Sequence, residues 1–173
     1  CTLMTAQIIS QETSCSIHIS HAIREIVKVS GSFKDFKGLK MQQILNHYPS
    51  TVPSCLPYPW WKDEAETFSQ VCQRVSPFIS EIIQKNEDCL LIGHGASISA
   101  ANYLMQNRSG KRFNEVFKAV GFNCSLSEYL ILEDQTAIMR YFDFSHIPLS
   151  MLSSNKVMAL EDMTPEQKEV HYR

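Results

Sequence analysis

The sequence lacks the features that mark several large classes of protein. Among its 173 residues, no apolar run approaches the roughly 18 residues that a membrane-spanning helix needs. Neither sign of charge dominates, because 16 Lys and Arg residues oppose 18 Asp and Glu residues for a net charge of -2. A chain without a basic surplus has no electrostatic footprint for nucleic acid or for an anionic membrane. We therefore expect neither a nucleic-acid partner nor a membrane partner.

The cysteines also lack a recognisable pattern. The six of them include no C-x-x-C pair, and their spacing matches no zinc motif. Cys72 and Cys89 lie in apolar stretches, where a thiol behaves as a small hydrophobic group. No charged and apolar signal segment is visible. We expect a reduced, cytoplasmic protein that uses no metal and no cofactor, and a disulfide-bonded protein is the alternative.

The length suits one domain with a real core, which we place at residues 1–150, followed by a polar tail at 151–173. Apolar periodicity predicts helices over 4–10, 35–49, 63–84, 97–106 and 113–120, and strands over 15–19, 89–93, 126–132 and 136–142. Pro77 should kink the longest helix, and the prolines of 50–61 predict a loop. An apolar strand between two helices argues for an α/β fold with a covered sheet.

The stretch CLLIGHGASISAANYLM (89–105) is the most informative one. It places Gly93-His94-Gly95 where the predicted strand meets the predicted helix. Ligands of α/β folds bind at such strand ends, and a helix N-terminus favours an anion. Glycines permit close approach of the backbone, and an imidazole adds a donor or a positive charge. This combination predicts a phosphate site, and the alternative is a structural histidine in a tight turn.

Two other motifs compete for the same stretch. A dinucleotide-binding G-x-G-x-x-G fails at Ile98 and lacks the acidic residue expected about 20 positions later. A nucleophile elbow G-x-S-x-G misses only its last glycine, with Ser97 as the nucleophile and Asp143 and His146 following in the required order. A serine hydrolase that uses Ser97 therefore stays a weaker alternative, because the chain is short for that fold and shows no oxyanion loop.

Several segments, in order, resemble one family. MTAQIIS resembles the helix after an S-P-x-x-R-x-x-x-T-A segment, AIREI resembles L-R-E-I, and the stretch ending in Tyr48-Pro49 resembles a helix closed by Tyr-Pro. EAETFSQVCQRV resembles G-E-S-x-x-x-F-x-x-R-V, and GFNCSLSEYLIL resembles the turn before the final strands. Together with Gly-His-Gly, these segments make residues 4–145 similar to the histidine phosphatase superfamily, with its phosphoglycerate mutase-like fold. The Pro-rich insert with Trp60-Trp61 resembles the branch of the suppressor of T-cell receptor signalling proteins and ecdysteroid phosphatases.

The resemblance implies a three-layer α/β/α fold and hydrolysis of a phosphomonoester through a phosphohistidine. His94 would be the second histidine, which contacts the phosphoryl group, with Gly95 and Ala96 as backbone N–H donors. Glu25 would protonate the leaving oxygen, and the alternative for Glu25 is a surface carboxylate. Glu66 would support the site or would simply favour a helix start. The substrate would be a phosphorylated small molecule or a phosphoprotein, and phosphotyrosine, sugar phosphates and steroid phosphates all remain open.

One departure from the family is serious. The sequence contains no Arg-His-Gly, the motif that carries the family's attacking histidine, and the position of a family arginine falls on Cys1. We expect the nucleophile and the first strand upstream of residue 1, in which case this chain alone would be inactive. The alternative is a catalytically inactive member that acts as an interaction or regulatory module. The alternating segment 126–142 would offer an edge for a homodimer.

Overall fold

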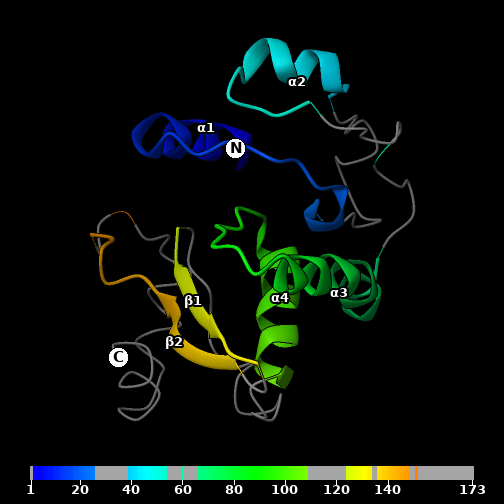
Figure 1. Ribbon diagram of the computed structural model, residues 1–173, viewed down its shortest axis with the longest axis vertical. Helices are drawn as coiled ribbons and strands as arrows, with labels where there is room; N and C mark the ends of the chain where they lie inside the picture. Colours follow the sequence, from blue (N-terminus) through cyan, green and yellow to red (C-terminus); the bar gives the residue numbers. More distant parts are fainter. Residues whose placement is uncertain are drawn as a thin grey trace. The chain divides into compact units, whose positions relative to one another are not determined.

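Helices and one antiparallel hairpin make up the computed structural model, which describes residues 2–25, 39–53, 60, 66–108, 124–133, 136–148 and 151. In chain order the elements are α1 (Thr2–Thr13), the 3-10 helix η1 (His21–Ile23), α2 (Met41–His47), α3 (Phe68–Lys85), α4 (Gly95–Arg108), β1 (Leu126–Ile131) and β2 (Thr136–Asp143) (Figure 1). The chain divides into two compact units, 1–100 and 101–173, with the division inside α4, and each unit is described by itself. The helix expected at 113–120 lies outside the described residues.

The long helix α3 confirms the strongest sequence prediction. It begins after Thr67, whose hydroxyl accepts a hydrogen bond from the Gln70 N–H, while the Gln70 side chain accepts one from the Thr67 N–H. This reciprocal arrangement satisfies backbone donors that a helix start leaves unpaired. Val71, Val75 and Ile79 recur every four residues on one buried face. The helix continues through Pro77 and ends at Asn86, which adopts the left-handed conformation (φ 51°).

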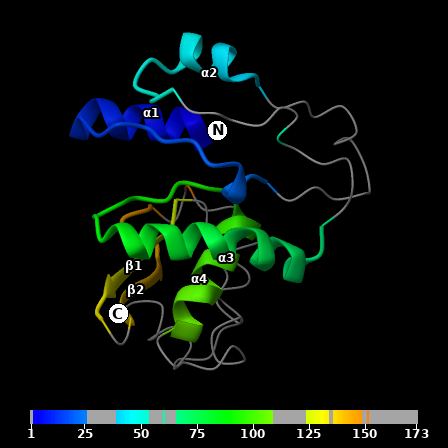
Figure 2. The ribbon, with the colours of Figure 1, turned by 45° about the vertical axis from the view of Figure 1, so that its right-hand side comes forward.

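In the first unit, α3 also packs against η1 (Figure 2). This packing brings a segment from near the start of the sequence against a helix from the middle of the sequence. The strand expected over 15–19 is reduced to one parallel bridge between Ile17 and Thr51. The Ile17 N–H donates to the Ser50 carbonyl at 3.0 Å, and the Val52 N–H donates to the Ile17 carbonyl at 2.9 Å. This bridge connects the segment before η1 to the segment after α2. Ile17 itself is buried.

The helix α2 and the loop after it follow the sequence prediction in part. Ile44 is buried on α2, and the helix ends at His47, two residues before Pro49. The residues of 54–59 and Trp61 lie outside the described part of the loop. Trp60 is half-buried, and its indole N–H donates to the Leu39 carbonyl at 3.0 Å. The contact fastens one point of the Pro-rich loop to the chain just before α2.

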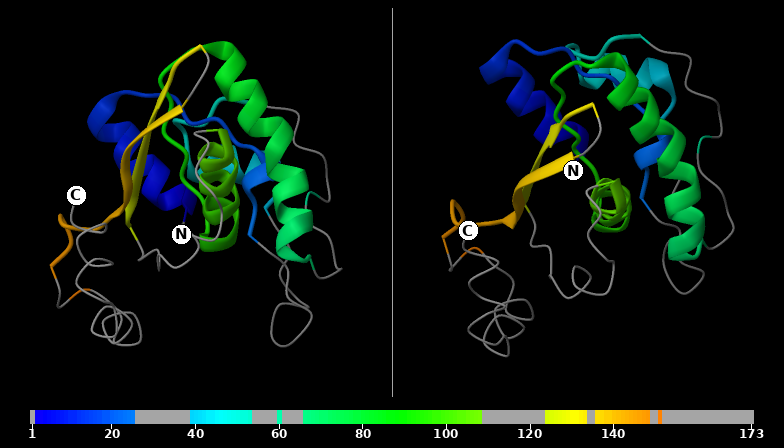
Figure 3. Two further views of the ribbon diagram at one scale, coloured as in Figure 1. Left: turned by 90° about the horizontal axis from the view of Figure 1, so that it is seen from below. Right: turned by 60° about the horizontal axis from the view of Figure 1, so that its bottom comes forward.

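In the second unit, β1 and β2 form the predicted hairpin (Figure 3). The strands pair antiparallel, with a register that runs from Leu126 opposite Asp143 to Ile131 opposite Thr136 and shifts on either side of Glu128. A buried amide links this hairpin to the second half of α4. Asn102 donates to the Ser127 hydroxyl at 3.1 Å and accepts from the Tyr129 hydroxyl at 3.0 Å. The mixture of helices and paired strands agrees with the predicted α/β class.

The buried strand predicted over 89–93 is wrong in two respects. The segment forms no strand, and among the described residues no backbone hydrogen bond joins it to another segment. It is also not buried at its start, because Cys89 is exposed and Leu90 is 58% exposed. A strand is stable only when its N–H and C=O groups find a neighbouring strand, and no described segment supplies one.

Candidate functional site

The site begins at the turn between residues 89–93 and α4. The His94 carbonyl accepts the first helical hydrogen bond, from the Ile98 N–H at 2.9 Å, and α4 starts at Gly95. The first N–H groups of a helix have no intrahelical acceptor and carry the positive end of the helix dipole. Gly95 and Ala96 are in this first turn, directly beside the imidazole of His94. The turn therefore offers backbone donors and a side-chain donor to one anion.

The two glycines of this turn serve different purposes. A Cβ atom at Gly93 would lie 3.0 Å from Cδ1 of Ile98 and 3.2 Å from the hydroxyl of Ser97, so a side chain there would press tightly on two side chains of the first turn of α4. A Cβ atom at Gly95 would meet nothing within 4 Å. Gly93 lets the chain pass close to α4, whereas the position that a Cβ of Gly95 would take is open.

Glu25 and His94, the two residues that the resemblance assigns to the site, lie side by side. The Nδ1 atom of His94 is 2.6 Å from Oε2 of Glu25, and the two side chains are 30% and 35% exposed. Glu25 follows η1 and His94 precedes α4, so two segments far apart in sequence supply this pair. The partial exposure of both side chains leaves the pair accessible to a ligand.

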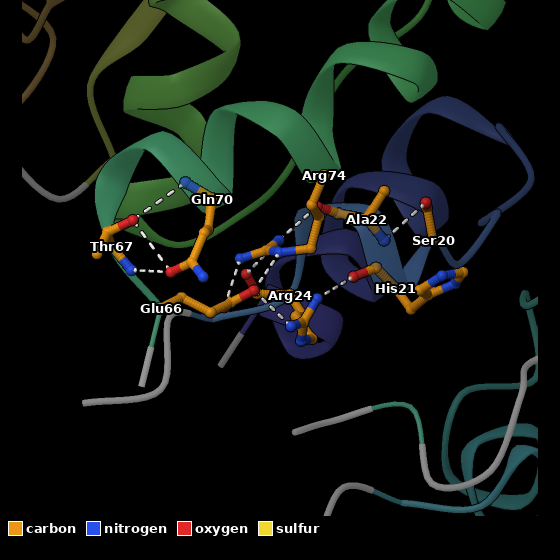
Figure 4. Close-up of polar contacts among 8 residues, drawn as sticks. All are labelled: Ser20, His21, Ala22, Arg24, Glu66, Thr67, Gln70 and Arg74. Carbon is orange, nitrogen blue, oxygen red and sulfur yellow. Dashed lines mark hydrogen bonds and ion pairs between the residues drawn. The ribbon is translucent and has the colours of Figure 1, made fainter. Parts of the chain in front are cut away.

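Arg24, the residue before Glu25, forms a buried ionic cluster with Glu66 and Arg74 (Figure 4). Glu66 accepts from Nη2 of Arg24 at 2.6 Å and, on both carboxylate oxygens, from Nε and Nη2 of Arg74 at 2.9 and 3.0 Å. The remaining nitrogen of Arg74, Nη1, donates to the carbonyl of Ala22 at 2.5 Å and to that of Arg24 at 3.3 Å. One guanidinium on α3 thus joins a carboxylate to the backbone that leads into Glu25.

This cluster holds two guanidinium groups against one carboxylate, with side-chain exposures of 5% for Arg24, 12% for Arg74 and 8% for Glu66. Burial lowers the pKa of the Arg24 guanidinium from its ordinary value, and the charge of Arg74 lowers it further, while Glu66 opposes both effects. The Nε atom of Arg24 is buried without a hydrogen-bond partner among the described residues. Glu66 is therefore the group that makes it possible for two buried arginines to lie together.

Sequence reasoning placed Glu66 near the site and missed Arg74. Arg74 lies within an apolar helical pattern and matches the arginine of F-x-x-R-V in the resemblance, but nothing in its spacing shows that it reaches the backbone before Glu25. The available signal was an arginine one position before the buried Val75, because a charge so close to a core position needs a buried partner.

The geometry argues against the serine-hydrolase alternative. Ser97 is fully buried, and its hydroxyl donates to the His94 carbonyl at 3.0 Å. A nucleophile must be reachable by its substrate, whereas this hydroxyl is buried and bonded to the backbone at the start of α4. In the second unit, the Asp143 carboxylate accepts from the Ser145 N–H at 2.9 Å, and His146 Nε2 lies 3.0 Å from the Cys124 carbonyl oxygen. Both predicted partners of Ser97 thus make contacts within the second unit.

The described ranges contain neither a metal-ligand cluster nor a membrane-spanning helix. No group of three or more His, Cys, Asp or Glu side chains there is placed to hold a metal ion. Among these same residues, no helix combines the length and apolar character that a membrane crossing requires. The thiols of Cys15, Cys72, Cys89 and Cys124 are free.

Comparison with known proteins places the chain in a family. No curated protein and no solved structure matches it. The sequence model of the histidine phosphatase superfamily (branch 1) matches residues 2–143, which include the AIREI segment, α3 and the Gly-His-Gly turn. The match covers most of the chain, and this protein belongs to the histidine phosphatase superfamily, branch 1.

Proposed function

We propose that this protein hydrolyses a phosphomonoester through a phosphohistidine, with His94 contacting the transferred phosphoryl group and Glu25 as the proton donor. The observation that carries the proposal is the 2.6 Å contact between Nδ1 of His94 and Oε2 of Glu25 beside the open start of α4. Family membership supports phosphatase or mutase chemistry at this place. The attacking histidine is not assigned to any residue of this sequence, which contains no Arg-His-Gly.

The His94–Glu25 pair can hold its proton in two ways. With the proton on the ring, Glu25 is a carboxylate that accepts from Nδ1, and the ring is an imidazolium. With the proton on the carboxyl group, Glu25 donates to Nδ1, and the neutral ring keeps its hydrogen on Nε2. In both states Nε2–H can donate to a phosphoryl oxygen. The second state also holds a proton ready for transfer to a leaving oxygen.

The reaction then proceeds in two steps. In the first, the attacking histidine forms a P–N bond, the P–O bond to the leaving group breaks, and Glu25 gives its proton to the leaving oxygen. In the second, water forms a new P–O bond, the P–N bond breaks, and the Glu25 carboxylate takes up the proton of the water. In both steps His94 Nε2–H and the backbone N–H groups of Gly95 and Ala96 neutralise charge on the phosphoryl oxygens. No proton or charge is left over after one cycle.

Vanadate binding tests the site on this chain directly, since vanadate mimics a phosphoryl group in transfer. We expect vanadate to raise the melting temperature of the wild type and of His18→Ala, which removes an exposed histidine of the same unit. His94→Ala should abolish the shift. Absence of a shift in the wild type, or an undiminished shift in His94→Ala, would refute the proposed phosphoryl site.

A non-catalytic interaction module that keeps this anion site is the second candidate, and it stays open because no residue of this sequence is assigned as the attacking histidine. Turnover separates the two. The protein is isolated from its source, its intact mass and N-terminal peptide are determined, and phosphate release from p-nitrophenyl phosphate is measured. A longer product that carries Arg-His-Gly and releases phosphate supports the hydrolase. A product that binds vanadate without releasing phosphate supports the module.

A further inference from the structure

The segment that carries Glu25 has little structure of its own to hold it in place. η1 is a single turn of 3-10 helix, His21–Ile23, and Arg24 follows it in an extended conformation (φ -61°, ψ 163°). Such short 3-10 turns have poor hydrogen-bond geometry and are weak in isolation. The position of Glu25 therefore depends on what the preceding backbone contacts.

Arg74 supplies those contacts from α3. Its Nη1 atom donates to the carbonyls of Ala22 and Arg24, at 2.5 and 3.3 Å. The Arg24 carbonyl belongs to the peptide bond whose nitrogen is that of Glu25, so Arg74 acts one peptide unit from the proposed proton donor (Figure 4). Packing of η1 against α3 places the same segment on the same helix.

The orientation of the Arg74 guanidinium is itself fixed by Glu66. Two parallel hydrogen bonds, from Nε and Nη2 of Arg74 to the two oxygens of Glu66, hold the guanidinium plane in one orientation. That orientation directs Nη1 at the two carbonyls. A lysine has donors for the carbonyls but no planar fork that could engage the carboxylate and the backbone at once.

The geometry points to Arg74, oriented by Glu66, as the positioning residue that holds Glu25 against His94. The inference deepens the proposed function and rests on it for the role of Glu25. The placement of Glu25 beside His94 can, however, be measured without any catalysis. Arg74 touches neither the substrate nor the reacting atoms and acts through the backbone of Ala22 and Arg24.

Arg74→Met is the decisive variant. It removes the guanidinium, keeps most of the side-chain volume and leaves Arg24 and Glu66 as one ion pair of zero net charge, so the fold has no uncompensated buried charge. The position of Glu25 is read from the imidazole nitrogen shifts of His94 in long-range 1H–15N spectra of the full chain, with Glu25→Gln as the reference for a disturbed contact. We expect Arg74→Met to move the His94 signals most of the way toward that reference.

Two matched variants separate positioning from stability. Val75→Ala empties a fully buried position next to Arg74 without touching the carbonyls of Ala22 and Arg24, and it should lower the melting temperature but leave the His94 signals unchanged. Arg74→Lys should give intermediate signals, since it restores a donor but not the fork. It also takes the place of Arg74→Met if that variant does not fold.

Turnover gives the second readout in the full-length protein. With a poor leaving group such as an alkyl phosphate, Arg74→Met should lower kcat about tenfold while KM changes less than twofold, because proton donation and not binding is disturbed. Failure of the proposed function would show as no turnover and no vanadate binding in the wild type, and the His94 signals would still decide the positioning inference. His94 signals that stay at wild-type values in Arg74→Met, or that move equally in Val75→Ala, would overturn it.

Discussion

At the scale of single residues, the two glycines around His94 allow packing and ligand binding to be separated. Gly93→Ala places a methyl group 3.0 Å from Cδ1 of Ile98 and 3.2 Å from the buried Ser97 hydroxyl, so these side chains must move by a few tenths of an ångström, and we expect a loss of about 1 kcal/mol in the free energy of unfolding. Gly95→Ala meets no neighbour and should change that free energy by less than about 0.5 kcal/mol. Urea unfolding of both variants measures the difference.

Gly95→Ala should nevertheless weaken vanadate binding, because its methyl group enters the open space at the first turn of α4, where the anion is proposed to bind. A Gly95→Ala protein that is stable and binds vanadate as tightly as the wild type would show that the anion does not lie over the first turn of α4. Equal stability losses in the two variants would contradict the packing argument.

Cys89 gives a second prediction at this scale. Although the residue as a whole is exposed, partial desolvation of the thiol raises its pKa above the ordinary value of 9.0, and the nearby charges of Asp88 and Glu87 raise it further. Since the thiolate is the reactive form, iodoacetamide should alkylate Cys89 slowly at pH 7.5, and the rate should keep rising above pH 9.0. Alkylation is followed by peptide mass spectrometry.

Asp88→Asn removes one of the two charges and should speed this alkylation of Cys89 at pH 7.5 by a modest factor, because the partial desolvation of the thiol, which is the larger cause, remains. Ser80→Asn, at an exposed position of α3, is the matched control and should leave the rate unchanged. A rate that is already maximal below pH 8 would contradict the raised pKa.

The site residues show what a sequence can and cannot reveal. Gly-His-Gly and AIREI were recognised because each is a local string of residues, and the structure brings His94 and Glu25 together. Arg74 was not assigned a role, since its partners at Ala22 and Arg24 are backbone carbonyls, and these carry no signature in the sequence. Contacts to backbone from a distant helix become visible only when the chain is folded.

At the scale of elements, the Thr67 side chain caps the beginning of α3. Thr67→Ala removes the hydroxyl that accepts from the Gln70 N–H, and we expect a loss of about 1 kcal/mol in the free energy of unfolding. Ser69→Ala, two residues later on an exposed position of the same helix, is the control and should be neutral or slightly stabilising. Urea unfolding followed by circular dichroism compares the two, and equal effects would exclude a capping role for Thr67.

Elements with local causes were predicted well, and those that depend on distant partners were not. α3 carries its own cap, its own period at Val71, Val75 and Ile79, and its own stop at Asn86. The hairpin β1–β2 likewise pairs with its neighbour in sequence. The segments 15–19 and 89–93 have strand-like composition, but a strand needs a neighbouring strand to pair with. In the described structure, segment 15–19 forms a single bridge, and segment 89–93 forms no bridge.

At the scale of the whole molecule, these differences in hydrogen bonding imply a wide spread of local stability. The backbone of α3 is bonded within the helix and buried along Val71, Val75 and Ile79. The segment 89–93 lies in the same unit, yet no backbone hydrogen bond joins it to any other described segment. Amides exchange with solvent through local opening, and an amide without a backbone acceptor needs no opening to exchange.

Hydrogen exchange measured by NMR should therefore rank the segments of the first unit. We expect the amides of Leu90, Leu91 and Ile92 to exchange on the order of 100-fold or more faster than those of Val71 and Val75. The Ile17 amide, which donates to Ser50 at 3.0 Å, should lie between these extremes because a single bridge opens more easily than a helix. Protection of 90–92 equal to that of α3 would mean that this segment is paired as a strand in solution, as its apolar composition alone predicts.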